Sequence, residues 1–178
     1  MAKTGFAQTI LKPFIVLVCI CLVAAALLGY THGVTEPIIL TMQEKAAQEA
    51  RIAVLPGATT FTKVDCDEEA LGIMEAYKED SGLGYVVSAQ RKGYGGEVTA
   101  TVGLDEYGNI VGILADVSSE TQGVGTKVGI QAYLDNYVGN AHPAQVDGIS
   151  GATYSSNAMR ESIVAITNAF ETIKEAAK

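Results

Sequence analysis

Small residues and hydroxyl side chains gather in one stretch, Asp147 to Asn157, which reads DGISGATYSSN. A helix is predicted to begin inside this stretch, and the first backbone N–H groups of a helix have no partner within it. These groups and the positive end of the helix dipole favour a phosphate, which Gly151 and Ala152 would allow to approach the backbone closely. The alternative is an ordinary loop that ends in a serine N-cap, Ser155 or Ser156. The residue types alone leave both interpretations open.

Nucleophilic and metal chemistry are poorly supported by the same sequence. A hydrolase would use Ser150 or Ser155, but only His142 is near enough to serve as a base, and no Gly-x-Ser-x-Gly elbow is present. His32 and His142 have no cysteine or carboxylate neighbours at metal-ligand spacing, so no metal site is predicted.

Glycine-rich and acidic segments elsewhere also fit no known site. The third glycine of residues 123–129 comes one position late for a dinucleotide loop, and no P-loop motif occurs. The acidic clusters at 65–69 and 79–82 lack the glycine and the regular alternation of a calcium loop. We interpret both clusters as solvated loops or helix ends.

Strand and helix patterns predict the frame that would position the 147–157 stretch. Three β-branched runs, at 85–89, 97–102 and 110–115, are separated by turn residues at 91–96 and 105–109. Short turns of this kind join antiparallel strands, so the sheet should be mostly antiparallel. A short helix is predicted around Val128, Gln131, Leu134 and Tyr137, closing near Gly139. A long C-terminal helix is predicted from the repeat of Met159, Ile163, Ile166, Phe170, Ile173 and Ala177. The fold class is therefore α+β.

An uncharged, mostly apolar segment lies near the start of the chain. No charged residue occurs from Pro13 to Thr35, and as a helix these 23 positions would span roughly 34 Å, enough for a hydrocarbon core of about 30 Å. A cleaved signal peptide is the alternative, because Ala24 to Ala26 offer small residues, but the apolar run continues past them. We therefore predict a transmembrane anchor over 13–35, a stalk helix over 36–56 that begins at Thr35–Pro37, and a domain over 57–178.

The flanking charges predict the orientation of this anchor. Lys3 and Lys12 precede it and no basic residue follows until Lys45, which places residues 1–12 in the cytoplasm and the domain outside it. The part beyond the anchor then carries 10 of the 12 basic residues and all 20 acidic ones. Such an acidic surface would repel phosphates, so no nucleic-acid partner is predicted. Cys66 is the single cysteine there and has no disulfide partner in that part.

Three motifs occur in the order found in a known family of FMN-binding domains. Residues 147–153 read Asp-x-x-Ser-Gly-Ala-Thr and resemble the flavinylation motif of domains whose FMN phosphate is esterified to threonine. Residues 93–96 (GYGG) and 120–125 (ETQGVG) resemble the other two motifs. With the anchor, the resemblance covers essentially the whole chain. It is to the G subunits of Rnf-type ion-translocating ferredoxin:NAD oxidoreductases, relatives of the C subunit of sodium-translocating NADH:quinone reductase.

The resemblance implies a covalent FMN and the residues that hold it. Thr153 would be the attachment site through a phosphoester, and the motif is completed by Asp147, Ser150, Gly151 and Ala152. A separate flavin transferase would attach the cofactor, with FAD as donor. Candidate walls of the isoalloxazine site, where glycine permits contact with a flat ring, are Glu120, Thr121, Gly123, Gly125, Gly95 and Gly96.

The function implied by the resemblance is electron relay in a membrane-bound, ion-pumping redox complex. The chain would be a single-pass protein of the cytoplasmic membrane, with an extracytoplasmic FMN-binding domain. Its partners would be the other subunits of this translocase, and no independent catalytic activity is expected. The residue types keep one alternative open, a cofactor-free membrane-anchored binding or assembly module in which Thr153 is only a turn residue.

Overall fold

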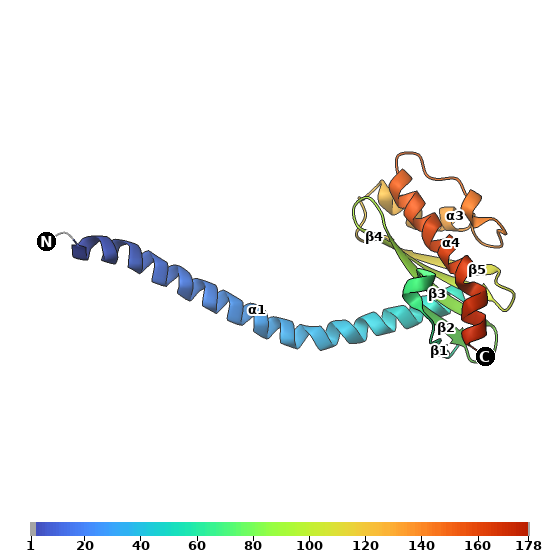
Figure 1. Ribbon diagram of the computed structural model, residues 1–178, viewed down its shortest axis with the longest axis horizontal. Coiled ribbons are helices and arrows are strands. Elements are labelled where there is room, and N and C mark those ends of the chain that lie inside the picture. The colour runs from blue at the N-terminus through green and yellow to red at the C-terminus, as the bar shows by residue number, and fades with distance from the viewer. Residues whose placement is uncertain (1–2, 178) are drawn as a thin grey trace. The chain divides into compact units, whose positions relative to one another are not determined.

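The computed structural model describes the backbone of residues 3–177, and the side chains of 13–177 apart from those of 34, 37, 38, 40 and 43. The chain divides into two compact units, Met1–Ala46 and Ala47–Lys178. The elements follow in the order α1, β1, α2, β2 to β5, η1, α3, η2 and α4 (Figure 1).

The first unit is helical throughout its described part. Helix α1 runs from Lys3 to Val54. Its segment Pro13–Gly33 has a mean hydropathy of 2.6 and is long and apolar enough to cross a membrane. This segment lies within the predicted anchor. The side chains of Lys3 and Lys12, on which the predicted orientation depends, lie outside the described residues.

The predicted start of a separate stalk helix is wrong, because α1 continues through Thr35 and Pro37. A proline inside a helix removes one backbone donor, but the helix continues on both sides of it. The hydroxyls of Thr31 and Thr35 donate to carbonyls one turn back within the same helix. The predicted end is confirmed, since α1 stops at Val54, just before Pro56.

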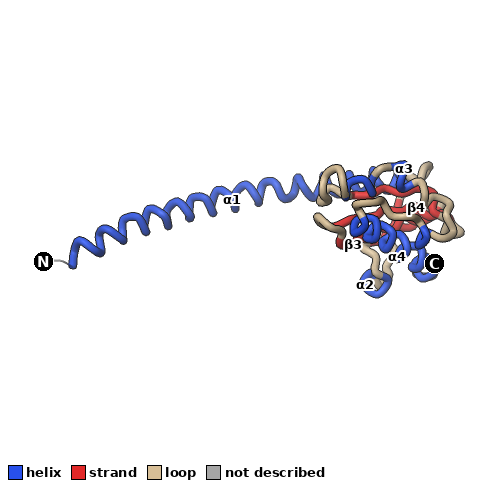
Figure 2. Tube along the Cα trace, turned by 90° about the horizontal axis from the view of Figure 1, so that it is seen from above, coloured by secondary structure: helices blue, strands red, loops and turns tan. Residues whose placement is uncertain are grey.

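A single antiparallel sheet, red in Figure 2, forms the centre of the second unit. Its strands lie side by side in sequence order. The strands are β1 (Phe61–Lys63), β2 (Glu75–Glu79), β3 (Gly84–Lys92), β4 (Glu97–Asp105) and β5 (Ile110–Asp116). The three predicted strands and the two turns between them are confirmed. The sequence shows no clear signal for β1, which has three residues, or for β2, which reads EAYKE and has no β-branched residue.

The long C-terminal helix α4 (Thr153–Ala176) covers one face of this sheet, and the main core lies between them (Figure 1). The predicted helical repeat is confirmed from Met159 through Ile163, Ile166 and Phe170 to Ile173, which are all buried. Its last predicted member, Ala177, is the C-cap residue just after the helix and is half-buried. The fold is α+β, as predicted. Four short elements complete the domain: α2 (Glu68–Leu71), η1 (Gly125–Gly129), α3 (Gln131–Leu134) and η2 (Pro143–Gln145). The single short helix predicted near Leu134 is therefore two elements, η1 and α3.

The end of α1 packs on the opposite face of the sheet. Successive strand residues point to opposite faces, and Val86, next to the core residue Val87, joins a second cluster with Val54. Gly103 and Gly112 are cross-strand partners, and a Cβ on either would lie within 2.4 Å of the Val54 carbonyl oxygen. The last turn of α1 is therefore seated directly on the backbone of β4 and β5.

Glu79 is buried, which corrects the interpretation of residues 79–82 as a fully solvated loop. Its side chain is 1% exposed. One carboxylate oxygen accepts hydrogen bonds from the Ser81 hydroxyl at 2.6 Å and from the N–H groups of Ser81 and Leu83 at 2.8 and 3.1 Å. The bond from the Ser81 hydroxyl is the largest cause that lowers the pKa of Glu79. The carboxylate thereby closes the β2–β3 turn.

We expect Glu79→Gln to lower the melting temperature of the detergent-solubilised chain at pH 7. The folded-state pKa is below its ordinary value, so this stabilisation is fully present above pH 5 and is lost as the pH falls through the lowered pKa. The stability difference between wild type and variant should therefore shrink between pH 5 and pH 3. Thermal melts across this range provide the test, with exposed Glu69→Gln as the control. Equal melting temperatures at pH 7 would contradict the role of Glu79.

Candidate functional site

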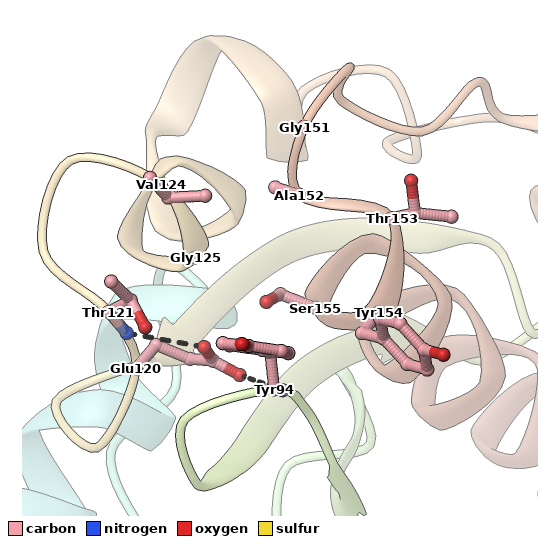
Figure 3. Close-up of a pocket in the computed structure, with 10 residues that line it drawn as sticks. All are labelled: Tyr94, Glu120, Thr121, Val124, Gly125, Gly151, Ala152, Thr153, Tyr154 and Ser155. Carbon is pink, nitrogen blue, oxygen red and sulfur yellow. Dashed lines mark hydrogen bonds between the residues drawn. The ribbon is translucent and has the colours of Figure 1, made fainter.

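A cavity of about 380 Å³ lies beside the start of α4 (Figure 3). One side is formed by residues 151–155, where the chain enters the helix. The other side comes from Tyr94 in the β3–β4 turn and from the loop that follows β5, with Glu120, Thr121, Val124 and Gly125. Thus the three sequence motifs, which are far apart in the chain, approach one another in the fold.

Thr153 is the first residue of α4 and is exposed at this cavity. The first bond of the helix runs from the Ser156 N–H to the Ala152 carbonyl, so the N–H groups of residues 153–155 precede it. Gly151 has a φ of +84°, which only glycine adopts readily, and no atom lies within 4 Å of where its Cβ would be. The entry to the helix is therefore open and rich in N–H donors.

The predicted serine N-cap is wrong. Ala152 occupies the N-cap position, and no side chain caps the helix. Ser156 lies within the first turn, where its hydroxyl accepts a hydrogen bond at 2.9 Å from the N–H of Ile149. Ser156 thus holds the preceding loop against the helix and leaves the helix N–H groups free. Serine is a common N-cap residue, and for this reason the sequence favoured Ser155 or Ser156 over Ala152.

Glu120 joins the two loops that face the helix. Its side chain is 5% exposed, and its carboxylate accepts hydrogen bonds from the N–H groups of Tyr94 at 2.9 Å and Gly95 at 3.1 Å. A third bond, at 3.3 Å, comes from the N–H of Thr121. The β3–β4 turn is therefore tied to the loop after β5 by one buried carboxylate.

The glycines of the two loops are required by this contact. A Cβ on Gly93 would lie 1.8 Å from one carboxylate oxygen of Glu120, and a Cβ on Gly125 would lie 2.2 Å from the other. A Cβ on Gly96 would lie 2.4 Å from the Cβ of Ser119. Glycine is therefore needed at these positions so that the two loops can pack against each other. The sequence had suggested another role for glycine here, contact with a flat ring.

The predicted site residues fall into two groups. Those that line the cavity are Glu120, Thr121, Gly125, Gly151, Ala152 and Thr153. Those outside its lining are Asp147, Ser150, Gly123, Gly95 and Gly96. Asp147 is exposed and lines a separate hollow with Asn136 and Asn140, while Gly95 supports the cavity through its bond to Glu120.

Two lining residues were not predicted to hold the cofactor: Tyr154, and Ser155, which was considered only as a helix cap or a nucleophile. Tyr94 and Val124 lie within the motifs at 93–96 and 120–125, whose residues were candidate walls. Tyr94 and Tyr154 are 75% and 70% exposed, and their ring centroids lie 6.2 Å apart. Aromatic rings that remain exposed beside a cavity can pack against a flat ligand. The sequence position of both tyrosines could have indicated this role, because each is adjacent to a predicted site residue.

The cavity suits an aromatic ligand that carries an anionic group. Apolar surface from Val124, Ala152 and the tyrosine rings lines its interior, and unpaired helix N–H groups lie at its edge. Hydrolysis by a serine is not supported, since His142 lines a different cavity and Ser150 is exposed outside this one. Within the described residues no group of three or more potential metal ligands comes together.

Comparisons with known proteins agree with this geometry. Residues 93–168 match the FMN-binding domain family, and this range contains all three motifs. The G subunit of the ion-translocating oxidoreductase complex of Methanosarcina acetivorans is 30% identical, over 88% of this chain and 92% of that protein. The G subunit of the Na⁺-translocating ferredoxin:NAD⁺ oxidoreductase complex of Acetobacterium woodii is 29% identical, over 82% and 77% of the two chains. The proton-translocating counterpart of Clostridium ljungdahlii is 24% identical, over 89% and 80%.

We expect Glu120→Ala to loosen the β3–β4 turn without unfolding the domain. Hydrogen bonds to a charged acceptor contribute about 1.5–3 kcal/mol, so the amides of Tyr94 and Gly95 should exchange with solvent at least about tenfold faster. Hydrogen–deuterium exchange measures this directly. Asp116→Ala is the control, because among the described residues that exposed carboxylate accepts only from the N–H of Ser118, its near neighbour in sequence. Unchanged exchange at both amides would show that Glu120 does not hold the turn.

Proposed function

Because the chain belongs to the family of G subunits of ion-translocating ferredoxin:NAD oxidoreductases, we propose that it carries FMN esterified to Thr153 and relays electrons through it. The observation that carries the proposal is the placement of the Thr153 hydroxyl. It is exposed, it has no hydrogen-bond partner among the described residues, and it lies at the first position of a long helix beside an apolar cavity.

The start of α4 fits a phosphate attached at Thr153. The N–H groups of residues 153–155 are not used by the helix, and the positive end of the helix dipole favours the negative oxygens of a phosphodiester. Figure 3 shows the Thr153 oxygen pointing away from the loop that carries Glu120. The open space around Gly151 leaves room for the attached group.

The cavity fits a flat ring system. Its lining is mainly apolar, and the exposed rings of Tyr94 and Tyr154 flank it. When bound, FMN supplies one- and two-electron redox chemistry. Attachment through the phosphate leaves the ring itself unsubstituted, so the chain's role is to position the ring and set its surroundings. This supports a function as an electron carrier between partner subunits.

Attachment requires an activity that the cavity does not provide. A threonine hydroxyl is a poor nucleophile without a base or a metal ion. Among the described residues that line the cavity, the only carboxylate is that of Glu120, and it already accepts three N–H hydrogen bonds. We therefore propose that a flavin transferase acts on this chain with FAD as the donor, forming the Thr153 phosphoester and releasing AMP.

The segment Pro13–Gly33 is proposed to anchor the chain in the cytoplasmic membrane. Lys3 and Lys12 precede this segment and the next basic residue is Lys45, so the positive-inside rule places the amino terminus in the cytoplasm. The FMN-binding domain would then lie on the extracytoplasmic side, where it would join the other subunits of the complex.

We expect Thr153→Ala to give a folded protein without covalent flavin. The bonding oxygen is removed at an exposed position where a smaller side chain disturbs no packing. The measurement is the intact mass of the denatured full chain, coexpressed with a flavin transferase. Wild type should gain the mass of FMN less one water, and the variant should not.

Two further variants control this experiment. Thr126→Ala removes a hydroxyl from η1, where it accepts from the N–H of Gly123, and should stay flavinylated. Thr153→Ser keeps the oxygen and should retain flavin. Covalent flavin on Thr153→Ala would exclude Thr153 as the attachment site.

We also expect reporters fused after Lys178 to report an extracytoplasmic location. Alkaline phosphatase, which is active only after export, should be active there, and a fluorescent protein that matures only in the cytoplasm should remain dark. Changing Lys3 and Lys12 together to glutamine should weaken this preference, because both positive charges before the anchor are lost. If the wild-type fluorescent fusion is bright and the wild-type phosphatase fusion is inactive, the domain lies inside the cell.

A further inference from the structure

Ser155 has an unusual position in the cavity wall. Its side chain is 1% exposed and lines the cavity, yet its hydroxyl makes no hydrogen bond with any described residue. Figure 3 shows its oxygen directed into the space between α4 and the loop that contains Gly125. The other hydroxyls of the lining, on Thr121, Thr153, Tyr94 and Tyr154, belong to exposed residues.

The neighbouring serines of α4 show that the missing bond at Ser155 is a local feature. A helical serine can donate to a carbonyl one turn back, but Ser155 does not do so within the described structure. Ser156, the next residue, accepts from the N–H of Ile149. Ser162 is also buried and unpartnered among the described residues, but it does not line the cavity. In the part of the chain that the structure describes, only Ser155 combines burial, an unused hydroxyl and access to the cavity.

Other polar groups of the cavity cannot replace Ser155 as a buried donor. Glu120 is an acceptor when ionised, and its carboxylate already accepts from the N–H groups of Tyr94, Gly95 and Thr121, so it cannot donate. The surrounding surface is apolar, from Val124 and Ala152. Among the described residues, Ser162 Oγ is the enclosed side-chain atom without a partner, whereas the Ser155 oxygen faces the cavity. A ligand that fills the cavity would enclose the Ser155 hydroxyl, which would then need a polar atom of that ligand as its partner.

We infer that the Ser155 hydroxyl donates a hydrogen bond to a heteroatom of the flavin ring, and that it thereby raises the reduction potential of the cofactor. This inference rests on the proposed attachment of FMN at Thr153. Reduction adds electron density to the ring heteroatoms, and a donor strengthens its bond as the acceptor becomes more negative. Ser155 is thus a positioning and potential-setting residue, distinct from the attachment residue.

Ser155→Ala tests the inference on the full chain in detergent, loaded by coexpression with a flavin transferase. Loading is first measured by intact mass, and the midpoint potential is then measured on the covalently bound flavin. We expect reduced flavin to be disfavoured about tenfold relative to wild type, equivalent to about 59 mV for a one-electron couple. The visible absorption bands, which respond to hydrogen bonding at the ring, should shift as well.

Ser162→Ala is the matched control, because it removes a second buried and unpartnered hydroxyl from the same helix but outside the cavity. Its potential and spectrum should equal those of wild type. Ser155→Thr keeps the donor and should hold the wild-type potential. If Ser155→Ala is not loaded, Ser155→Thr and Ser155→Cys are compared, and the potential should fall only with cysteine, a weak donor.

The outcomes separate the inference from the proposed function. Absence of covalent flavin from wild type would overturn the proposed attachment, and the inference with it. Flavin on wild type, with an unchanged potential and spectrum in Ser155→Ala, would leave the attachment intact and overturn the inference alone. If Ser155→Ala is not loaded, equal potentials in Ser155→Thr and Ser155→Cys would likewise overturn the inference alone. A lower potential in Ser155→Ala alone supports the hydrogen bond.

Discussion

The buried carboxylate of Glu120 is the contact on which the shape of the cavity depends. It holds the turn at Tyr94 against the loop after β5 through hydrogen bonds from backbone N–H groups. The side chain of Tyr94 takes no part in these bonds and can line the cavity. A buried carboxylate is stable only when its oxygens are hydrogen-bonded, and three N–H groups meet that need. The absence of a side chain at Gly93 and Gly125 is what allows the carboxylate to lie between the loops.

The position of Thr153 depends on packing at a distance from it. Helix α4 is fixed against the sheet by buried residues along its length, from Met159 to Ile173, and the first turn is therefore held rigidly at the cavity. Ser156 fixes the incoming loop to that same turn. On the opposite face, the end of α1 rests on Gly103 and Gly112, so both faces of the sheet are covered where β4 and β5 meet. Thr153 itself stays exposed, because Ala152, Ser155 and Ser156 are the buried residues at the start of the helix.

The sequence predicted the parts of this domain that carry a clear local signal. The buried stripe of α4 could be predicted from its helical repeat, and the strands β3 to β5 from their β-branched runs and the turn residues between them. Strand β2 could not, since a central tyrosine and charged ends resemble a solvated segment, and the burial of Glu79 arises from a turn that sequence does not reveal. Within the site, the motif residues could be selected but their contacts could not. Glu120 was chosen as a wall residue, whereas the structure shows it as the link between two loops, and contacts across distant segments depend on how those loops close.

Covalent attachment is consistent with how few polar contacts this cavity offers. Ser155 supplies one hydroxyl without a partner in the described structure, and the buried carboxylate of Glu120 already accepts from three backbone N–H groups. The remaining lining is apolar or exposed. Such a surface can orient a ring, but it has few groups with which to retain a charged cofactor by noncovalent contacts alone. A phosphoester at an exposed threonine would retain the cofactor without adding polar groups to the cavity. The exposed rings of Tyr94 and Tyr154 could then remain open to a partner, as an electron carrier requires, because retention would no longer depend on enclosing the ligand.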